Sequence, residues 1–290
     1  MKTIEHLRGE WLEWRHNRVA VLSRPYGWTS LVSQDWIHEG ENPRRLDGLP
    51  GSWAVVDNKV IYTPDADEPN LSVDGEYPTA PVEIGPGRNM VYGHGNSVAV
   101  YFGDCEVESI LRTSEAGEQI FAIRKRDPKV SAARDFSGVV ARDYNPRWRV
   151  PASFTPSKAI DVEAVTVETG VRETTPQIGT LHVELDGKVY DLVVIGKNSV
   201  HGVVPNVHIR DLTSGRTTYG AGRLVEMQFA NAENTQIDTV DFNYLVPLPC
   251  AFTSYVTCPL PPPQNFVNIE IDAGEKKPAE DIERIMTYAS

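Results

Sequence analysis

Short runs of β-branched and aromatic residues, separated by Gly, Pro, Asn and Asp, fill most of the chain from residue 28 to residue 277. Examples are WAVVD, KVIYTP, SVAVYFG, QIFAIR, DVEAVTVE, KVYDLVVIG and FVNIEID. Roughly a dozen strands at this spacing are typical of a sandwich or a barrel. Asp186 and Gly187, between the alternating runs HVEL and KVYDLVV, are a strong signal for a two-residue hairpin turn. The sequence therefore predicts a mainly β fold with antiparallel β-barrel or sandwich architecture.

One helix is predicted at each end of this β region. Near the start, apolar side chains recur at intervals that place them on one stripe of an amphipathic helix; they are Ile4, Leu7, Trp11 and Trp14. The segment SRPYGW ends that pattern. The closing segment PAEDIERIMTYAS begins with a proline and has acidic residues in its first turn, so a short C-terminal helix is expected.

The least strand-like stretch in the middle of the chain is RKRDPKVSAARDFSG, and it marks the predicted domain boundary. Residues 1–27 then form the N-terminal helix, residues 28–125 an N-terminal β subdomain, and residues 126–290 a barrel-like C-terminal subdomain. The two β subdomains can share one core.

Charge and composition narrow the classes of partner. The formal net charge is −12 at pH 7, whereas binding to nucleic acid or anionic lipid draws mainly on basic faces. The chain has no run of eighteen apolar residues, and charges are spread through its start, so a soluble cytoplasmic protein is expected. Three cysteines and no His-x-His or His-Glu-x-x-His spacing indicate reduced thiols and no metal site. A homo-oligomer is compatible with the sequence.

Four segments carry a family resemblance: IRKRDPKVSAARDFSG, RDLTSGRTTYGAGR, TVDFNYLVPLPCAFTSYVTCPLPPPQN and IEIDAGEK. Together they resemble the bacterial and archaeal family known as domain of unknown function 1684. The early segment EWLEWRHNRVAVLSRPYGWTSLVSQDWIHEGEN is a looser match to the same family's opening, so the resemblance extends from about Trp11 to Lys276. The resemblance implies no particular reaction, because the family's activity is unassigned. His208 stands where the family usually has an apolar or aromatic residue, and DFNYLVPLPC replaces the commoner Asn-Pro-Pro-Cys arrangement. These departures indicate a specialised member with an altered pocket.

Two polar strand faces form the main candidate site. Alternation places Tyr219 and Arg223 on one face of TTYGAGR, and Asp241 and Asn243 on one face of TVDFNY. If these two strands are neighbours, the four side chains form one cluster. An arginine and a carboxylate there could bind an anionic or carbonyl substrate, with Tyr219 as proton donor. The alternative is a structural ion pair between Arg223 and Asp241, with the adjacent glycines marking a bulge.

His208 is a further candidate, as a general base, because imidazole titrates near neutral pH. The alternative is a packed histidine without a catalytic role. Four more polar residues are assigned to substrate binding: Asn243, Arg210, Thr253 and Asn265.

Cys250 and Cys258 lie in CAFTSYVTCPLPPPQN, ahead of a run of prolines. Three interpretations stay open: a nucleophile with a resolving thiol, a redox-sensitive pair, or two packed thiols. The neutral, apolar surroundings favour packed thiols, because a reactive thiol needs an electropositive and partly exposed setting. Prolines lack amide donors, so this segment is expected to be a stiff strap along the β domain.

The leading functional prediction is an enzyme of hydrolase, lyase or isomerase type that acts on a small organic molecule by acid-base chemistry. Its catalytic residues would be Tyr219, Arg223, Asp241 and His208, with no metal, nucleotide or other cofactor. The alternative is a non-catalytic β domain that binds a ligand or another protein. Catalysis predicts converging polar groups with perturbed ionisation, whereas protein interaction predicts an exposed apolar patch or a free sheet edge.

Overall fold

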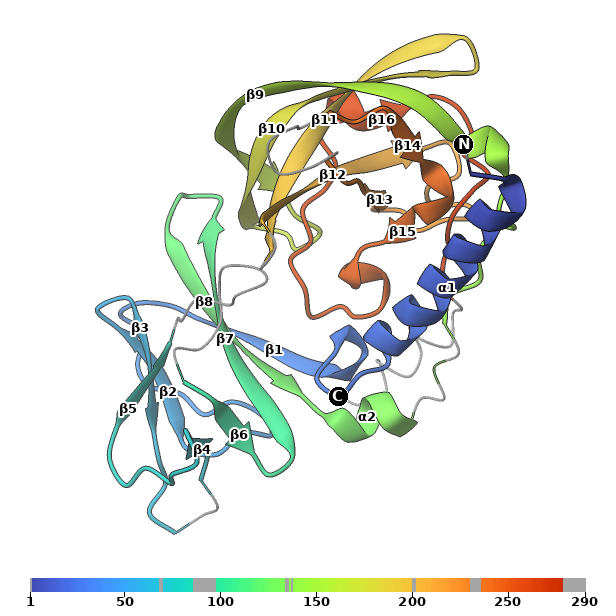
Figure 1. Ribbon diagram of the computed structural model, residues 1–290. Helices are drawn as coiled ribbons and strands as arrows, with labels where there is room; N and C mark the ends of the chain where they lie inside the picture. The colour runs from blue at the N-terminus through green and yellow to red at the C-terminus, as the bar shows by residue number, and fades with distance from the viewer. Residues whose placement is uncertain are drawn as a thin grey trace.

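The computed structural model describes residues 2–67, 70–85, 98–133, 136, 138–199, 202–229 and 236–278. Figure 1 shows a mainly antiparallel β protein with one long helix along one side. In these ranges, a 13-stranded sheet runs in the order β1-β8-β7-β10-β11-β12-β13-β15, with the remaining strands as branches, and a smaller sheet has the order β2-β3-β5. The predicted fold class is confirmed, and the architecture is sandwich-like.

The N-terminal β unit contains the first eight strands: β1 (Leu31–Ile37), β2 (Ser52–Val56), β3 (Lys59–Thr63), β4 (Ser72–Val73), β5 (Val82–Gly85), β6 (Val100–Phe102), β7 (Cys105–Ser114) and β8 (Gln119–Arg126). Its core contains Trp53, Tyr62, Phe121 and Ile123, which are fully buried. Phe121 and Ile123 alternate with Ala122 and Arg124 along β8, so this strand turns its apolar face to that core and its other face elsewhere.

The C-terminal β unit contains the other eight strands: β9 (Arg149–Val165), β10 (Val171–Leu185), β11 (Lys188–Ser199), β12 (Gly202–Asp211), β13 (Arg223–Glu226), β14 (Thr239–Asp241), β15 (Val246–Pro247) and β16 (Phe266–Val267). They surround a second apolar core that includes Trp148, Leu192 and Phe242. The pairing of Val171 with Ser114 and of Arg172 with Thr113 joins β10 to β7 and makes the large sheet continuous between the two units.

The predicted hairpin between β10 and β11 is confirmed. Leu185 pairs with Lys188, and the two residues between them, Asp186 and Gly187, have φ angles of 50° and 72°. Positive φ at both central positions defines a type I′ turn, whose twist matches that of the flanking strands.

The strands of the C-terminal unit curl round its core. At one end of the series β14 pairs with β9, and at the other end β15 pairs with β13. The 3-10 turn Phe242–Tyr244 connects β14 to β15 along the chain. No strand pair among the described residues joins these two ends, so the unit is a curled, sandwich-like sheet and not a hydrogen-bonded barrel.

The predicted N-terminal helix is α1 (Ile4–Leu22), and it packs on the C-terminal unit (Figure 1). Trp11 is buried and its Nε1 donates a hydrogen bond to the Asn243 carbonyl at 2.9 Å. Trp14 packs edge-on against Tyr244. The middle of the predicted apolar stripe therefore contacts the C-terminal unit. Its first residue, Ile4, does not, since it is 54% exposed.

Shorter elements fill the connections. They are α2 (Pro128–Ala133), which lies in the predicted boundary segment, and five 3-10 turns: η1 (Trp28–Ser30), η2 (Pro146–Trp148), η3 (Phe242–Tyr244), η4 (Pro249–Ala251) and η5 (Pro263–Asn265). The expected C-terminal helix falls mostly on residues 279–290, which lie outside the described residues. The division into subdomains stays a prediction. In the described part of the chain, no helix combines the length and apolarity needed to cross a bilayer.

Candidate functional site

The two strands of the predicted cluster are not neighbours. β13, which begins with Arg223, pairs with β12 and β15, whereas β14, which ends with Asp241, pairs with β9. The expected Arg223–Asp241 pair is therefore wrong, because the chain adds β13 directly beside β12 and places β14 at the other end of the strand series. The carboxylate that Arg223 binds is Asp211.

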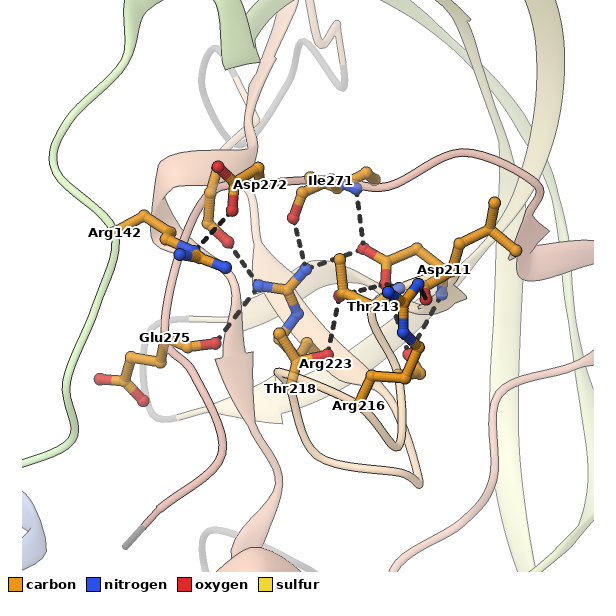
Figure 2. A network of polar contacts seen from close by, with 12 residues as sticks. Arg142, Asp211, Thr213, Arg216, Thr218, Arg223, Ile271, Asp272 and Glu275 are labelled. Atoms are coloured by element: carbon orange, nitrogen blue, oxygen red, sulfur yellow. Dashed lines mark hydrogen bonds and ion pairs between the residues drawn. The ribbon is translucent and has the colours of Figure 1, made fainter.

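Arg223 is the centre of a buried network, which Figure 2 shows. Its Nη2 lies 2.8 Å from Asp211 Oδ2 and also donates to the Ile271 carbonyl at 3.0 Å. Its Nη1 donates to the carbonyls of Ala273 and Glu275. Arg223 therefore binds the closing segment IEIDAGEK to the strand pair β12 and β13, with Asp211 in the place expected for Asp241.

Asp211 also builds the turn that follows β12. Its Oδ1 accepts hydrogen bonds from the backbone N and the hydroxyl of Thr213, and the Thr213 hydroxyl lies 2.8 Å from that of Thr218. A short carboxylate that binds its own backbone two residues on is a common way to start a turn. The polar residues of RDLTSGRTT are thus explained by folding.

Gly222 is required by a close backbone approach. Its φ is 95°, and a Cβ atom at this position would lie 2.4 Å from the Ile209 carbonyl oxygen. Gly220 has no such constraint, since its Cβ would meet only ordinary contacts with Gly215. One of the two glycines in TTYGAGR therefore has a specific packing reason.

Asp241 and Asn243 lie together in a different network. Asp241 caps the turn η3 and accepts a hydrogen bond from the Tyr144 hydroxyl at 3.0 Å. Asn243 Nδ2 donates to Asp241 Oδ1 at 2.7 Å and to the Asn145 carbonyl at 2.9 Å. Burial raises the pKa of Asp241, and burial followed by the nearby Asp241 charge raises the pKa of Tyr144. This network joins β14 to the segment before β9.

His208 is almost fully buried on β12, with 1% of its surface exposed. Its Nε2 lies 3.1 Å from the Ala221 carbonyl, which fixes this nitrogen as the protonated one. Burial lowers the pKa of His208 to about 4, so the ring is neutral at physiological pH. Arg210, two residues further along the strand, is exposed, so the two side chains do not share one enclosed site.

Thr253 and Asn265 are buried in the proline-rich segment. Asn265 accepts a hydrogen bond from Val193 N at 2.7 Å and donates to the carbonyls of Val193 and His208, each at 2.9 Å. The Thr253 hydroxyl accepts one from Tyr255 N. Asn265 therefore ties this segment to β11 and β12.

Tyr219 contacts the strap at another point. Its hydroxyl donates to the Cys250 carbonyl at 2.6 Å, and its ring packs near Phe252 in a small apolar cluster. Of the four predicted catalytic residues, Tyr219 is the one that lies beside a cysteine.

The sequence reasoning missed a charged seam on the N-terminal unit. Cross-strand partners share a face of a sheet, and here Glu108 pairs with Arg124 and Glu106 with Arg126. Arg112 continues this face along β7. Its Nε donates to Thr257 Oγ1 of the strap at 2.7 Å, and its Nη2 lies 3.7 Å from Glu173 of β10. The alternating charges of EVESILR and QIFAIRKR mark this face in the sequence, but they do not indicate that it is buried.

Arg124 and Arg126 differ in their partners. Arg126 binds Glu108 at 2.9 Å, donates to the Gly27 carbonyl at 3.0 Å and lies over the Trp28 ring. Arg124 is 3% exposed, and its Nε donates to Gln34 Oε1 at 2.9 Å. Within the described residues, its Nη2 is buried without a hydrogen-bond partner. Burial lowers the pKa of Arg124 to about 10, which still leaves the guanidinium charged at neutral pH.

The fold and these networks together define a mainly antiparallel β protein. In its C-terminal unit, the buried ion pair between Arg223 and Asp211, called the clamp below, holds the closing segment in place. Residues 134–276 match the sequence model of the family described as "Protein of unknown function (DUF1684)". This stretch of the chain, which contains the clamp and the strap, is similar to that family.

The other comparisons name no activity. No curated protein matches the chain significantly. The solution NMR structure of an uncharacterized protein from Haloarcula marismortui is 29% identical to this chain and covers 50% of it and 78% of its own length, with a TM-score of 0.40.

Proposed function

We propose that this protein binds a small carboxylate or phosphate anion in the seam between its two β units, at Arg124 and Arg112. The observation that carries the proposal is the buried Nη2 of Arg124, which has no partner in the described part of the chain. A charged donor left without an acceptor inside a protein costs stability, so its retention calls for an explanation.

The charges around Arg124 support an anionic ligand. No ion pair involves Arg124 among the described residues, and its one hydrogen bond goes to the neutral Gln34. Burial raises the pKa of Glu173, the carboxyl group nearest to Arg112, although both arginines oppose that shift. Arg112 and Arg124 both act on Glu173, whose ionisation is disfavoured, and the Glu108 carboxylate across the strand pair favours the charge of Arg124. A planar guanidinium binds a carboxylate or a phosphate through two parallel hydrogen bonds.

Protein binding by strand addition is less well supported. The outer edge of β9 has no strand partner beyond Pro151 in the described ranges, so it is a free edge. It carries Pro156 and Lys158, and a proline or a lysine on an edge strand hinders the addition of another strand. The geometry therefore favours a small ligand over a partner chain.

Acid-base catalysis by Tyr219, Arg223, Asp241 and His208 stays a prediction. The four side chains lie in separate networks, and the buried ring of His208 is neutral and bonded to a backbone carbonyl. A cytoplasmic location and the absence of nucleic-acid partners also stay predictions.

Isothermal titration with acetate, pyruvate, succinate and inorganic phosphate tests the proposal. We expect at least one of these anions to bind, and Arg124→Met to weaken its binding by roughly tenfold or more, the loss of one charge-assisted bidentate contact. Arg45→Met is the matched control, since Arg45 is 62% exposed and paired with Asp65. It should bind as the wild type does.

The ligand-free stability of the same variants separates this role from a structural one. Arg124 has no ion pair within the described ranges, so replacing this buried cation by an apolar side chain of similar length should leave the unliganded protein equally stable or more stable. A structural arginine would instead destabilise the protein when removed. Marked destabilisation by Arg124→Met, or no binding by any probe, would mean that Arg124 serves the fold and is satisfied by water alone.

A further inference from the structure

The strap brings two of the three cysteines together. Cys250 lies in the turn η4 and Cys258 eight residues further on, and both are free thiols that pack in one cluster with Leu248 and Val256. In this cluster the partly buried Cys250 packs against a buried group that includes Cys258. The third cysteine, Cys105, begins β7 in the N-terminal unit.

The environments of the two thiols differ. Cys258 is 7% exposed, and burial raises its pKa well above the usual range. Cys250 is partly exposed, and the neighbouring Cys258 thiol lowers its pKa, although burial opposes this shift. A partly exposed thiol with a stabilised thiolate is the one that attacks, and an adjacent buried thiol can resolve the product.

We infer that Cys250 and Cys258 form a reversible intramolecular disulfide by exchange with a small-molecule disulfide of the glutathione class. The Cys250 thiolate attacks one sulfur of the small disulfide, which forms a mixed disulfide and releases the first small thiolate. Cys258 then loses its proton and attacks the Cys250 sulfur, which forms the protein disulfide and releases the second small thiol. Two electrons pass from the protein thiols to the small disulfide.

The position of the pair gives this exchange a structural consequence. The Cys258 carbonyl accepts a hydrogen bond from Val167 N at 2.9 Å. The next residue, Pro259, forms an isolated β-bridge with Thr166. Cys250 is fixed through its carbonyl by Tyr219. The disulfide would therefore close a loop whose two ends are already attached to the β unit, so little rearrangement is needed to form it.

Folded protein incubated with oxidised glutathione, then alkylated and digested, tests the inference by mass spectrometry. We expect a Cys250–Cys258 cross-link in the wild type and in Cys105→Ser, and its loss on addition of dithiothreitol. Cys258→Ser should accumulate glutathione on Cys250. Cys250→Ser should react at Cys258 more slowly by roughly tenfold or more, because that thiol is buried and its thiolate is disfavoured.

A comparison with protein unfolded in urea controls for proximity along the chain. If the cross-link forms in urea but not in the folded wild type, the thiols are packed and inert, and the inference is overturned. Equal reactivity of the two single variants would equally overturn the assigned roles. The wild-type result does not depend on whether any variant folds, nor on anion binding at Arg124.

Discussion

Replacing Arg223 by methionine tests whether the buried clamp is essential for the stability of the C-terminal unit. The substitution removes the cation that binds Asp211 and the donors that satisfy the carbonyls of Ile271, Ala273 and Glu275. It keeps most of the apolar volume of the side chain. The principal effect is then electrostatic.

The expected loss of stability follows from the residual partners of Asp211. This carboxylate is 3% exposed and keeps four donors without Arg223: the Thr213 N and hydroxyl, the Ser214 hydroxyl at 3.5 Å and Ile271 N at 3.3 Å. Removing one member of a buried ion pair costs about 3–5 kcal/mol, because the other charge stays buried. The remaining donors to Asp211 place the expected value for Arg223→Met near the lower end, at about 3 kcal/mol.

Arg216→Met is the matched control within the same motif. Arg216 lies 2.7 Å from Glu270, but the two side chains are 67% and 55% exposed. An exposed pair of this kind contributes about 1 kcal/mol or less. Both variants change one arginine of RDLTSGRTTYGAGR to the same residue, so the difference between them reports burial and not composition.

Urea unfolding followed by tryptophan fluorescence measures both variants, since Trp148 lies in the core of the C-terminal unit. A double variant, Arg223→Met with Asp211→Asn, should be more stable than the sum of the single effects by about 1–3 kcal/mol, because the two charges interact. A loss below about 1 kcal/mol for Arg223→Met, or simple additivity in the double variant, would refute the clamp.

Two further predictions concern buried residues of the same region. The pKa of His208 is about 4 in the folded protein and about 6.5 in an unfolded chain, so the unfolded state binds more protons between these two pH values. The free energy of unfolding should therefore fall as the pH drops from 6.5 to 4, by on the order of 3 kcal/mol. His208→Gln should flatten this part of the pH dependence of the urea midpoint, and an unchanged slope would assign the dependence to other groups. Gly222→Ala should destabilise the protein by about 2 kcal/mol or more, because a Cβ there meets the Ile209 carbonyl, whereas Gly220→Ala should change stability by less than about 1 kcal/mol. Equal melting temperatures for the two alanine variants would contradict the backbone approach.

Local patterns predicted the elements well because their causes are local. The turn at Asp186 and Gly187 needs only two residues that tolerate positive φ between alternating runs. The N-terminal helix needs only its apolar stripe. The end of that stripe was predicted less well, since Ile4 is exposed and the later turns contact the fold through Arg15 and Arg18, which pair with the buried Glu275. Nothing in the helix sequence identifies a carboxylate that lies more than 250 residues away.

The partner of Arg223 could have been predicted by a rule of topology. Asp211 and Asp241 are equivalent candidates for the partner of Arg223 when only the alternation of side chains between the two faces of a strand is considered. Consecutive strands usually pair, and Arg223 begins the strand that follows the one ending with Asp211. The short connection between these two strands therefore favoured Asp211. The wrong pair was predicted because only the alternation of side chains along each strand was considered, and not the order of the strands along the chain.

The charged seam could not be predicted in this way. Alternating charges along EVESILR and QIFAIRKR are the ordinary pattern of a strand with one face in water. Here that face is covered by the strap and by β10, through Thr257 and Glu173. Whether such a face is solvated or buried depends on the placement of segments more than fifty residues away in sequence, which no local pattern contains.

Burial alone does not distinguish a structural arginine from a binding one. Arg223 and Arg124 are 1% and 3% exposed, and burial lowers the pKa of both. Arg223 has a carboxylate and three carbonyls, so its charge and its donors are satisfied within the chain. Among the described residues, Arg124 donates to one amide oxygen, and the Glu108 carboxylate on the paired strand favours its charge. Since a buried cation is tolerated only when something compensates it, the difference in partners, and not the shared burial, makes Arg124 the residue from which a ligand is inferred.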